Sequence, residues 1–504
     1  MNIKSNISIE KVSKKKNLFL IILLLSLLLN IFKPELYDSD IVFYAQGAKA
    51  MSDGNILYKD YGDVKPPGVF FIYYSVIKIA GENNVFLGLK VLSILFQVLS
   101  AYVLYLLLKR FFSVKTSFYT TIFFLFSLHS VKAWWHPSIF LMHLLPLFIS
   151  FYFLTSNDFN LKPKNIFLSA LFLGLGFLLS TNLVIYFIFY PILLYRKHRN
   201  VIKTILYSLI CLTGFIIPFL LALYYFWYKS AIDDFIWWNF KWASIYGSFY
   251  PLWLRIWKFF YGFLLTHGWI PVYVSGFYGL HKIIKNKGFS NNKELFILTV
   301  FFCSILARLM LVKGVERYYL FLVPSFILLL PYGYEVFKIK FLRILLVLPL
   351  IGFITTTKNA EEMKNLWINW KKERAKVYEY IINNSSQNDK IFVFNNGGTD
   401  EIYFFTNRKM ATSFPLPGQH LDYPYLWENK NYKGIELPWE KFLSEFERDK
   451  PVLFIDPSGD FFNFKDKDRK DKLKYYMDNF INMIKSKYER VFESNGFVIW
   501  KRKR

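Results

Sequence analysis

Long apolar runs separated by short polar stretches fill the first two thirds of this 504-residue chain. The runs recur from Asn17 to Thr357, and most reach the roughly 20 residues that an α-helix needs to cross a hydrocarbon core of about 30 Å. From about Lys358 the pattern changes to that of a water-soluble domain. The chain is therefore predicted to be mainly α, with a polytopic transmembrane bundle in residues 1–357 and a soluble domain in residues 358–504.

The soluble part has the pattern of a small α/β domain. A charged helical stretch precedes the short apolar run KIFVFN, and a second such run, PVLFIDPS, follows later. Both runs are short enough for buried strands, and the end of the chain is typical of a hairpin that turns at Asn495-Gly496. Strands alternating with helical patterns indicate an α/β fold.

Composition agrees with a membrane location. Hydrophobic residues make up 54% of the chain, aromatic residues 21% and charged residues only 19%, against about 25% charged in average soluble domains. The first apolar run, Asn17 to Phe32, is followed by no small-residue cleavage site, so we expect an uncleaved helix rather than a signal peptide. Cys211 and Cys303 lie inside apolar runs and indicate neither a disulfide framework nor a Cys/His metal cluster.

Basic residues set the expected orientation. The net charge is +26, but the Lys and Arg residues lie largely in short loops between apolar runs, where the positive-inside rule places them in the cytoplasm. No basic motif has nucleic-acid-binding architecture, so nucleic acid is not an expected partner. With the N-terminus in the cytoplasm, all later basic loops fall on that side if about 11 helices span the membrane. Residues 33–84 and the C-terminal domain then lie outside.

Two segments leave the path of the chain open. Counting Pro67–Ala80 as a full span would reverse the orientation of every later loop, so we expect it to lie in the membrane interface. The stretch from Leu252 to Lys285 contains Pro271 and fits either one long helix or a broken pair.

The external loop after the first span is rich in polar groups. They are Tyr37-Asp38-Ser39-Asp40, Tyr44, Asp53-Gly54, Tyr58, Asp60, Asp63 and Lys65-Pro66-Pro67. Carboxylates near a membrane surface can act as a general base or hold a divalent ion against a phosphate. They can also simply cap interfacial helices, and Asp38 or Asp40 before Ile41 would be an ordinary N-cap. A second polar pair, Asp233-Asp234, lies in another external loop beside Trp237-Trp238 and fits either an acceptor path or a solvated loop.

The order of the first-loop residues resembles that of the GT-C glycosyltransferases, in the branch of the protein O-mannosyltransferases and the lipid A aminoarabinose transferase. The matching segments are Asp40-Ile-Val-Phe-Tyr44-Ala45, Gly54-Asn-Ile-Leu-Tyr58-Lys-Asp60 and Lys65-Pro66-Pro67, followed late in the chain by Lys313-Gly-Val-Glu-Arg317-Tyr318-Tyr319. Asp38 departs from the family pattern, which more often has an acidic residue directly beside the key aspartate. The expected topology also agrees with that of the family.

The resemblance implies a sugar donor on a polyprenyl phosphate such as undecaprenyl phosphate, and an inverting transfer at the outer face of the membrane. It gives Asp40 the role of the base that accepts the acceptor's proton. The departing lipid phosphate would be held by Lys65 and Arg317, with Lys313 as a third cation. Substrate contacts would come from Asp38, Tyr44, Asp60 and Tyr318. Family branches differ in their use of a divalent ion, so a requirement for Mg²⁺ or Mn²⁺ stays open.

The implied protein is a multi-pass glycosyltransferase of the inner (plasma) membrane, with a lipid, glycan or protein acceptor that the sequence does not identify. The alternatives are a lipid-linked glycan flippase or transporter, and a surface-polysaccharide polymerase or ligase. Transporters usually carry paired repeats with sites near the membrane midplane. This chain shows no repeat, and its acidic cluster lies in a loop, which favours the transferase.

Overall fold

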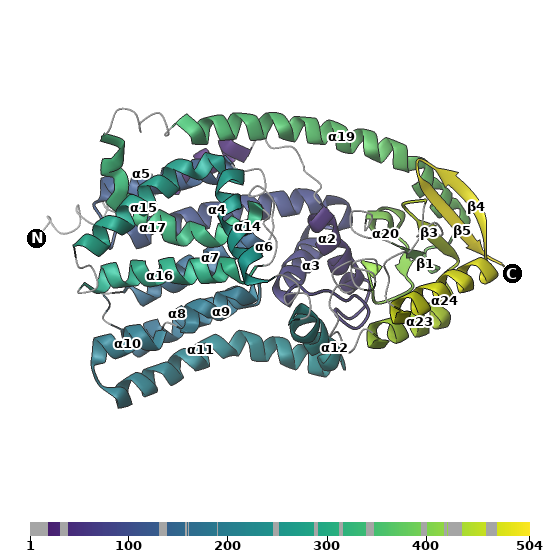
Figure 1. Cartoon of the computed structure of the whole chain (residues 1–504), viewed down its shortest axis with the longest axis horizontal. Helices are drawn as coiled ribbons and strands as arrows, with labels where there is room; N and C mark the ends of the chain where they lie inside the picture. Colours follow the sequence, from purple (N-terminus) through teal and green to yellow (C-terminus); the bar gives the residue numbers. More distant parts are fainter. Residues whose placement is uncertain are drawn as a thin grey trace, which may run out of the picture.

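In the computed structural model of the chain, helices form one half of the molecule, and a small sheet with its own helices forms the other (Figure 1). The structure describes residues 19–30, 39–130, 139–156, 159, 161–188, 190–244, 251–286, 291–311, 316–338, 347–394, 401–417, 421, 436–459 and 471–503.

The helical half is built from the following elements. They are the helix Phe19–Asn30, α2 (Ser39–Ser52), α3 (Pro67–Ala80), η1 (Glu82–Asn84), α4 (Val85–Leu108), α5 (Val114–His129), α6 (Ile139–Met142), α7 (Leu144–Leu154), α8 (Pro163–Phe177), η3 (Thr181–Leu183), α9 (Val184–Ile188), α10 (Tyr190–His198), α11 (Val201–Tyr228), α12 (Ile232–Ile236), η4 (Trp237–Trp242), α14 (Leu252–Leu265), η5 (His267–Trp269), α15 (Ile270–Lys285), α16 (Asn292–Leu309), η7 (Glu316–Leu322), α17 (Val323–Gly333) and η8 (Tyr334–Lys338).

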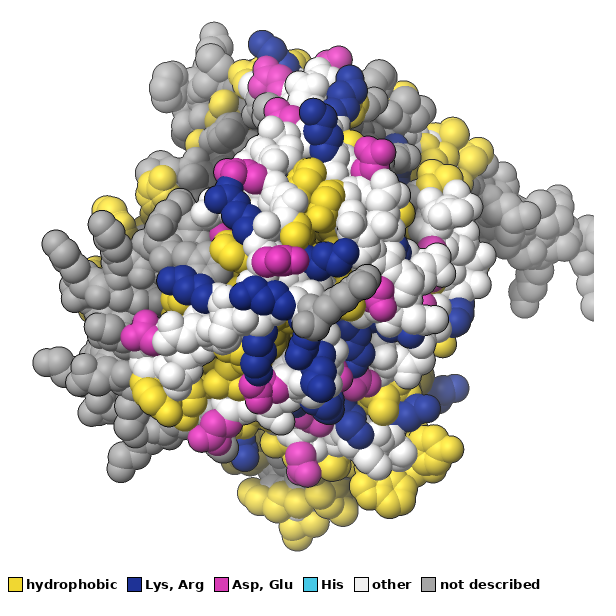
Figure 2. Space-filling view, turned by 90° about the vertical axis from the view of Figure 1, so that its right-hand side faces the viewer, with side chains coloured by type: hydrophobic (Ala, Val, Ile, Leu, Met, Phe, Trp, Pro, Cys, Tyr) yellow, Lys and Arg dark blue, Asp and Glu magenta, His cyan; other side chains and the backbone are white. Residues whose placement is uncertain are grey.

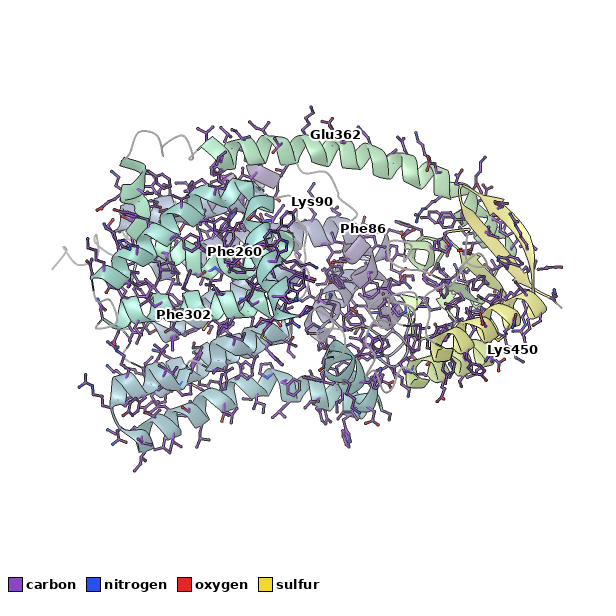
Figure 3. All side chains as sticks on the ribbon, viewed as in Figure 1. Phe86, Lys90, Phe260, Phe302, Glu362 and Lys450 are labelled. Carbon is purple, nitrogen blue, oxygen red and sulfur yellow. The ribbon has the colours of Figure 1, made fainter. Side chains whose placement is uncertain are left out.

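Several of these helices suit a lipid environment. Within the described ranges, three helical stretches are long and apolar enough to cross a membrane, namely Glu82–Leu108, Val201–Tyr228 and Tyr318–Phe337. Apolar side chains also face outward, among them Phe260 and Phe302, which are 60% and 53% exposed (Figure 3). Such surface is costly in water and stable against acyl chains. The total of about 11 spans remains a prediction.

The stretch from Leu252 to Lys285 is a broken pair of helices rather than one long helix. The 3₁₀ turn η5 separates α14 from α15, and Pro271 stands in the first turn of α15, where its missing N–H is tolerated. Trp269 in the turn is completely buried, and its indole N–H donates to the Ser127 carbonyl at 2.8 Å. The break is therefore anchored in the core of the bundle.

Basic side chains gather at one end of the helical half. Contacts between helix ends join Arg110 to Thr155, Lys293 to the Phe111 carbonyl, Arg196 to Asn292, and Lys282 to Glu335. The helix α4 runs from the first loop to this end, because it starts just after α3 and stops two residues before Arg110. The first loop and the basic ends thus lie at opposite ends of the bundle.

The C-terminal half begins with a 37-residue helix. Its elements are α19 (Leu348–Asn384), β1 (Lys390–Val393), α20 (Glu401–Thr406), β2 (Lys409–Met410), α23 (Glu436–Asp449), β3 (Leu453–Asp456), α24 (Asp471–Lys487), β4 (Tyr488–Ser494) and β5 (Phe497–Arg502). The sheet order is β2-β1-β3-β5-β4, parallel between β2, β1 and β3 and antiparallel at β5 and β4. The expected strands and the hairpin are confirmed, and both turn residues, Asn495 and Gly496, have positive φ as a tight hairpin requires.

The two faces of the sheet pack against different pairs of helices. One face packs against α19 and α20 through Val377, Ile381 and Ile402. The other packs against α23 and α24 through an aromatic cluster of Phe392, Phe442, Phe446, Phe454 and Phe480. The five strands are thus the middle layer of a small α/β domain.

The C-terminal domain is docked on the first loop. The Gly62 N–H donates to the Ser413 carbonyl at 2.7 Å, and the ring centres of Phe86 and Phe404 lie 5.4 Å apart. The helix α19 bridges the two halves, with Glu362 near its middle, and the boundary expected at residues 357/358 falls inside it (Figure 3). The first loop and the domain therefore lie at the same end of the bundle.

Candidate active site

The turn from Ile56 to Tyr61 shapes the first loop. The Asp60 carboxylate accepts the Ile56 N–H at 2.7 Å, and the Asp60 N–H donates to the Ile56 carbonyl at 2.8 Å. Tyr58 takes a positive φ of 69° and its N–H donates to the Tyr61 carbonyl. Asp60, predicted to contact substrate, thus closes this turn through one carboxylate oxygen.

Two buried tyrosines of the turn fix the backbone on either side of the site. The Tyr58 hydroxyl donates to the Lys65 carbonyl at 2.7 Å, and its ring packs between Phe226 and Phe235. The Tyr61 hydroxyl donates to the Phe43 carbonyl in α2 at 2.8 Å. Tyr58, whose ring packs on α11 and α12, therefore fixes the backbone at Lys65. Tyr61 fixes the loop to the backbone of α2.

Two glycines of the loop allow close approach to its neighbours. A Cβ on Gly62 would lie 2.2 Å from the buried Trp238 ring, and a Cβ on Gly68 would lie 2.5 Å from the Leu178 carbonyl. The Gly68 N–H donates to that same carbonyl at 2.9 Å. Since Pro66 and Pro67 fix the start of α3, Lys65 is placed beside the end of α8.

The charges of Asp40 in α2 and of Lys65 both act on the buried Asp63 of this loop. Asp63 is 3% exposed, and one carboxylate oxygen accepts the Val64 N–H at 2.7 Å. Its Oδ2 is buried and has no hydrogen-bond partner in the part of the chain that the structure describes. Burial raises the pKa of Asp63 to about 6; the nearby Lys65 opposes this rise, and the charge of Asp40 adds to it. We call this group the carboxylate–lysine cluster.

A second cationic centre lies at the end of α16. Arg308 is 1% exposed, its Nη2 donates to the Tyr319 hydroxyl at 3.2 Å, and its guanidinium stands 4.5 Å from the centre of the Tyr319 ring. Its charged or polar side-chain neighbours are the phenols of Tyr319, Tyr318 and Tyr273. Across the described ranges Arg308 has no carboxylate partner, and its Nε makes no hydrogen bond.

Arg308 lies at the same end of the bundle as the carboxylate–lysine cluster. The Leu178 carbonyl that meets Gly68 is followed by η3, where Asn182 donates to the Ala307 carbonyl at 3.3 Å. This chain of contacts leads from the start of α3 to the end of α16. The two cations Lys65 and Arg308 thus belong to the end of the bundle that faces the C-terminal domain.

The structure places the remaining predicted residues as follows. Tyr44 is 1% exposed, and its ring packs edge-on against Phe70 and Tyr73, so it fixes α2 on α3. Tyr318 is 9% exposed and lies beside Arg308. Asp38 and Lys313 lie outside the described residues, as does the side chain of Arg317.

Asp63 and Arg308 are the residues that the sequence alone did not single out. Asp63 is one of several acids in a polar loop, and nothing in the pattern distinguishes it. Arg308 carried a usable signal, because an arginine inside an apolar run is expected to face the bundle and mark a functional site. Asp234 and Trp238 turn out to bind the C-terminal domain, through an ion pair of 2.7 Å with Lys441 and a ring contact with Phe414.

Divalent-ion binding remains a prediction. In the described part of the chain no group of three or more His, Cys, Asp or Glu side chains is placed to hold a metal ion. Asp40 and Asp63 would provide two carboxylate ligands, and the unpartnered Oδ2 of Asp63 has the chemistry that Mg²⁺ or Mn²⁺ prefers.

Comparison with known proteins finds likeness in structure alone. No protein-family model and no curated protein matches the sequence. The crystal structure of ArnT from Cupriavidus metallidurans in the apo state superposes with a TM-score of 0.57 over 98% of each chain, at 9% identity. The chain therefore has an ArnT-like fold, which agrees with the fold that the first-loop motifs implied.

The archaeal oligosaccharyltransferase AglB of Archaeoglobus fulgidus superposes less well. Its complex with an inhibitory peptide and a dolichol-phosphate gives a TM-score of 0.46 at 11% identity, over 98% of this chain and 75% of AglB. Its complex with Zn and sulfate gives 0.43 at 11% identity, over 96% and 73%. The assignment of the fold rests on ArnT.

Proposed function

We propose that the chain is a membrane glycosyltransferase that moves a sugar from a polyprenyl-phosphate donor to a lipid, glycan or protein acceptor. The observation that carries this proposal is the carboxylate–lysine cluster, in which the charges of Asp40 and Lys65 both act on the buried Asp63 where the first loop meets the C-terminal domain. The GT-C fold supports it, because the cluster occupies the first loop expected to carry the reaction in that fold.

The chemistry follows from these side chains. Asp40 accepts a proton from the acceptor hydroxyl while the acceptor oxygen forms a bond to C1 of the sugar. The bond between C1 and the phosphate oxygen breaks, its electron pair leaves with the phosphate, and the configuration at C1 inverts. General-base catalysis of this kind contributes about 10² to 10⁴ in rate.

The leaving phosphate needs fixed positive charge in a medium of low polarity. Lys65 is one cation, held by the hydrogen bond from Tyr58 to its carbonyl. Arg308 is the second, because it has no carboxylate partner in the described ranges, and a buried guanidinium in that state is costly until an anion arrives. Arg317 and Lys313 remain proposed contributors from the segment just before α17.

The proposed orientation places the reaction outside the cytoplasm. The basic helix ends collect at the end of the bundle opposite the first loop, which supports a cytoplasmic position for them. The first loop and the C-terminal domain then share the outer face of the inner (plasma) membrane.

The test uses the full chain in nanodiscs, a panel of radiolabelled undecaprenyl-phosphate sugars, and membrane extracts as the source of acceptor. We expect Asp40→Asn to reduce both transfer and donor hydrolysis by at least about a hundredfold while the donor still binds. Asp478→Asn, an exposed change on α24, is the matched control.

Wild-type protein that binds no donor, or Asp40→Asn with wild-type rates, would overturn the proposal. A flippase would then be tested by transbilayer movement of the same lipids, and a polymerase or ligase by transfer of whole lipid-linked glycans.

A further inference from the structure

A polar pocket lies between α2, the first-loop turn and the C-terminal domain. We call it the interface pocket. It is an open hollow whose empty space, including the solvent at its mouth, is about 670 Å³. Its walls come from α2, the turn that follows it, the segment after β2, and the end of α23. Figure 2 faces this end of the molecule, where Lys and Arg side chains gather with Asp and Glu between them.

The interface pocket lies on the face of α2 away from Asp40. Its α2 residues are Gln46, Lys49 and Ala50, and Asp53 follows directly after the helix. The i, i+3, i+4 spacing of the three helical residues places them on a single helix face. Asp40 shares the opposite face with Gly47, where a Cβ would meet Phe70 and Tyr61. From Asp40 to Lys49 the helix rises about 14 Å, so the pocket is separate from the carboxylate–lysine cluster.

Most charged side chains of the pocket already have partners that fix its walls. Lys49 is 5% exposed and pairs with Asp53 at 3.3 Å and with Glu82 at 2.8 Å. Lys390 pairs with Asp449 at 2.8 Å. The walls are therefore formed before any ligand binds.

Other pocket groups are held by the main chain. Glu445 accepts both the N–H and the hydroxyl of Ser413, at 2.7 and 3.0 Å. Arg408 donates to the carbonyls of Thr406, Ile382 and Ser385. This wall joins β2 to α23 and to the end of α19.

Among the described residues, the side chains of Gln46 and Lys59 are pocket groups without such partners. Gln46 is 5% exposed, and its Oε1 makes no hydrogen bond within the described ranges. Lys59 is exposed, and the described part of the chain gives it no hydrogen bond or ion pair. The lining side chains comprise six Lys or Arg and four Asp or Glu, so the pocket carries a cationic excess.

We propose that the interface pocket binds an anionic saccharide, the part of the acceptor glycan that lies away from the reacting hydroxyl. The acceptor role rests on the proposed function. A saccharide presents donors and acceptors close together, and the pocket offers both kinds through the Gln46 amide, the Thr412 and Ser413 hydroxyls and the charged groups. Its acidic substituent lies against Lys59. Binding energy gained so far from the reacting atoms serves to orient the acceptor.

Direct binding to the full chain in nanodiscs tests the ligand class. The ligands are trigalacturonate, neutral maltotriose and inorganic phosphate, measured by calorimetry at two salt concentrations. We expect trigalacturonate to bind more tightly than the other two, and Lys59→Glu to weaken it about tenfold. Lys450→Glu, the same reversal at an exposed lysine that does not line the pocket, is the control (Figure 3).

Each alternative result overturns the proposal in a distinct way. If maltotriose binds as tightly as trigalacturonate, the pocket does not require an anionic ligand. If inorganic phosphate binds as tightly as trigalacturonate, the pocket does not recognise a saccharide. Trigalacturonate binding that is unchanged by Lys59→Glu locates the ligand elsewhere. Gln46→Met adds a second check, since it removes the unpartnered oxygen: we expect an undiminished Tm with weaker trigalacturonate binding, and unchanged binding would count against the pocket.

Kinetics separate this proposal from the proposed function. In a transferase, Lys59→Glu is expected to raise the KM for the extract acceptor about tenfold and leave donor hydrolysis at the wild-type rate, whereas Asp40→Asn loses both. An unchanged acceptor KM refutes the acceptor role even if the transferase is confirmed. If no donor is turned over by any variant, the transferase fails, and the calorimetry still decides whether the pocket binds an anionic saccharide.

Discussion

At the scale of single residues, the protonation state of the buried Asp63 carboxyl is expected to affect the stability of the fold. Its pKa rises from 3.8 to about 6, chiefly through burial. The folded state therefore holds the proton of the Asp63 carboxyl more tightly than the unfolded state does. Protonated Asp63 contributes its full share to the free energy of unfolding below about pH 3.8, and this contribution is lost as the pH rises through about 6. The full difference amounts to about 3 kcal/mol at most.

Asp63→Asn is therefore expected to be more stable than the wild type at pH 7.5 and to match it near pH 4, while it turns over donor more slowly. Thermal unfolding across this pH range and a donor-hydrolysis assay measure the two effects, with Asp478→Asn as the control. The prediction fails if Asp63→Asn is less stable than the wild type at pH 7.5, or if the difference in stability between the two does not vary with pH. Either result would show that ionised Asp63 does not destabilise the folded protein.

A second prediction concerns Arg308, a buried cation that has no carboxylate partner among the described residues. Arg308→Met is expected to leave the Tm of the ligand-free protein unchanged or higher, since replacing an unpaired buried charge by an apolar chain removes a desolvation cost. Undecaprenyl phosphate should stabilise the wild type and should lose most of that effect on the variant.

Neutral undecaprenol distinguishes the phosphate from the tail in this experiment, and Arg196→Gln in α10 is the control on the side of the bundle that bears the basic loops. If undecaprenyl phosphate stabilises Arg308→Met as strongly as the wild type, Arg308 is not a phosphate ligand and caps the end of α16 instead, through its contact with the Leu311 carbonyl.

The sequence led to Asp40 and Lys65 because they stand in an ordered motif, and the structure brings both to one cluster. Asp63 could not be found that way, since its importance comes from its burial in the folded loop and from the charge of Asp40, 23 residues earlier in the chain. Asp60 and Tyr44 show the converse: their types and spacing fit a substrate site, yet each makes contacts that set the backbone of the loop or the packing of α2.

At the scale of elements, the packing of α3 on α8 positions Lys65. Gly68→Ala would place a methyl group 2.5 Å from the Leu178 carbonyl, a backbone atom that has no rotamer by which to retreat. We expect the start of α3 to shift, with a loss of about 1 to 3 kcal/mol in stability and a larger fractional loss in donor hydrolysis.

Ser75→Ala on the exposed side of α3 is the matched control, because it removes only a bond to the Phe71 carbonyl of its own helix. Unfolding midpoints and hydrolysis rates are measured for both variants. Wild-type values for Gly68→Ala would mean that the contact with α8 does not position the loop.

Turn residues and short apolar runs in the sequence correctly predicted the C-terminal hairpin and two of the strands. The Asn495-Gly496 hairpin and the strands KIFV and LFID follow from turn residues and short apolar runs. The single helix Leu348–Asn384 did not, because its sequence changes from apolar to charged at about residue 358 while the backbone remains helical. The domain boundary was predicted at this change in composition, but the helix continues through it without a break.

At the scale of the whole molecule, two chemically different ends define an orientation. The basic helix ends occupy one end of the bundle, and the first loop with the C-terminal domain occupies the other. If the basic end lies in the cytoplasm, as the positive-inside rule predicts, Asp40 faces the outside, where the proposed lipid-linked donor would be used. The native cysteines, Cys211 and Cys303, are both buried, so single introduced cysteines can report on this arrangement.

In a variant with Cys211 and Cys303 replaced by alanine, Asp478→Cys is expected to react with a membrane-impermeant maleimide in intact cells. Lys197→Cys in α10 is expected to react only after the membrane is opened, because it lies among the basic helix ends. Labelling in the reverse order would place Asp40 and Lys65 in the cytoplasm, where a nucleotide-sugar donor would become the better candidate. Labelling of both positions in intact cells would mean that an even number of spans separates α10 from α24, which would contradict the predicted placement of the two helices on opposite sides of the membrane.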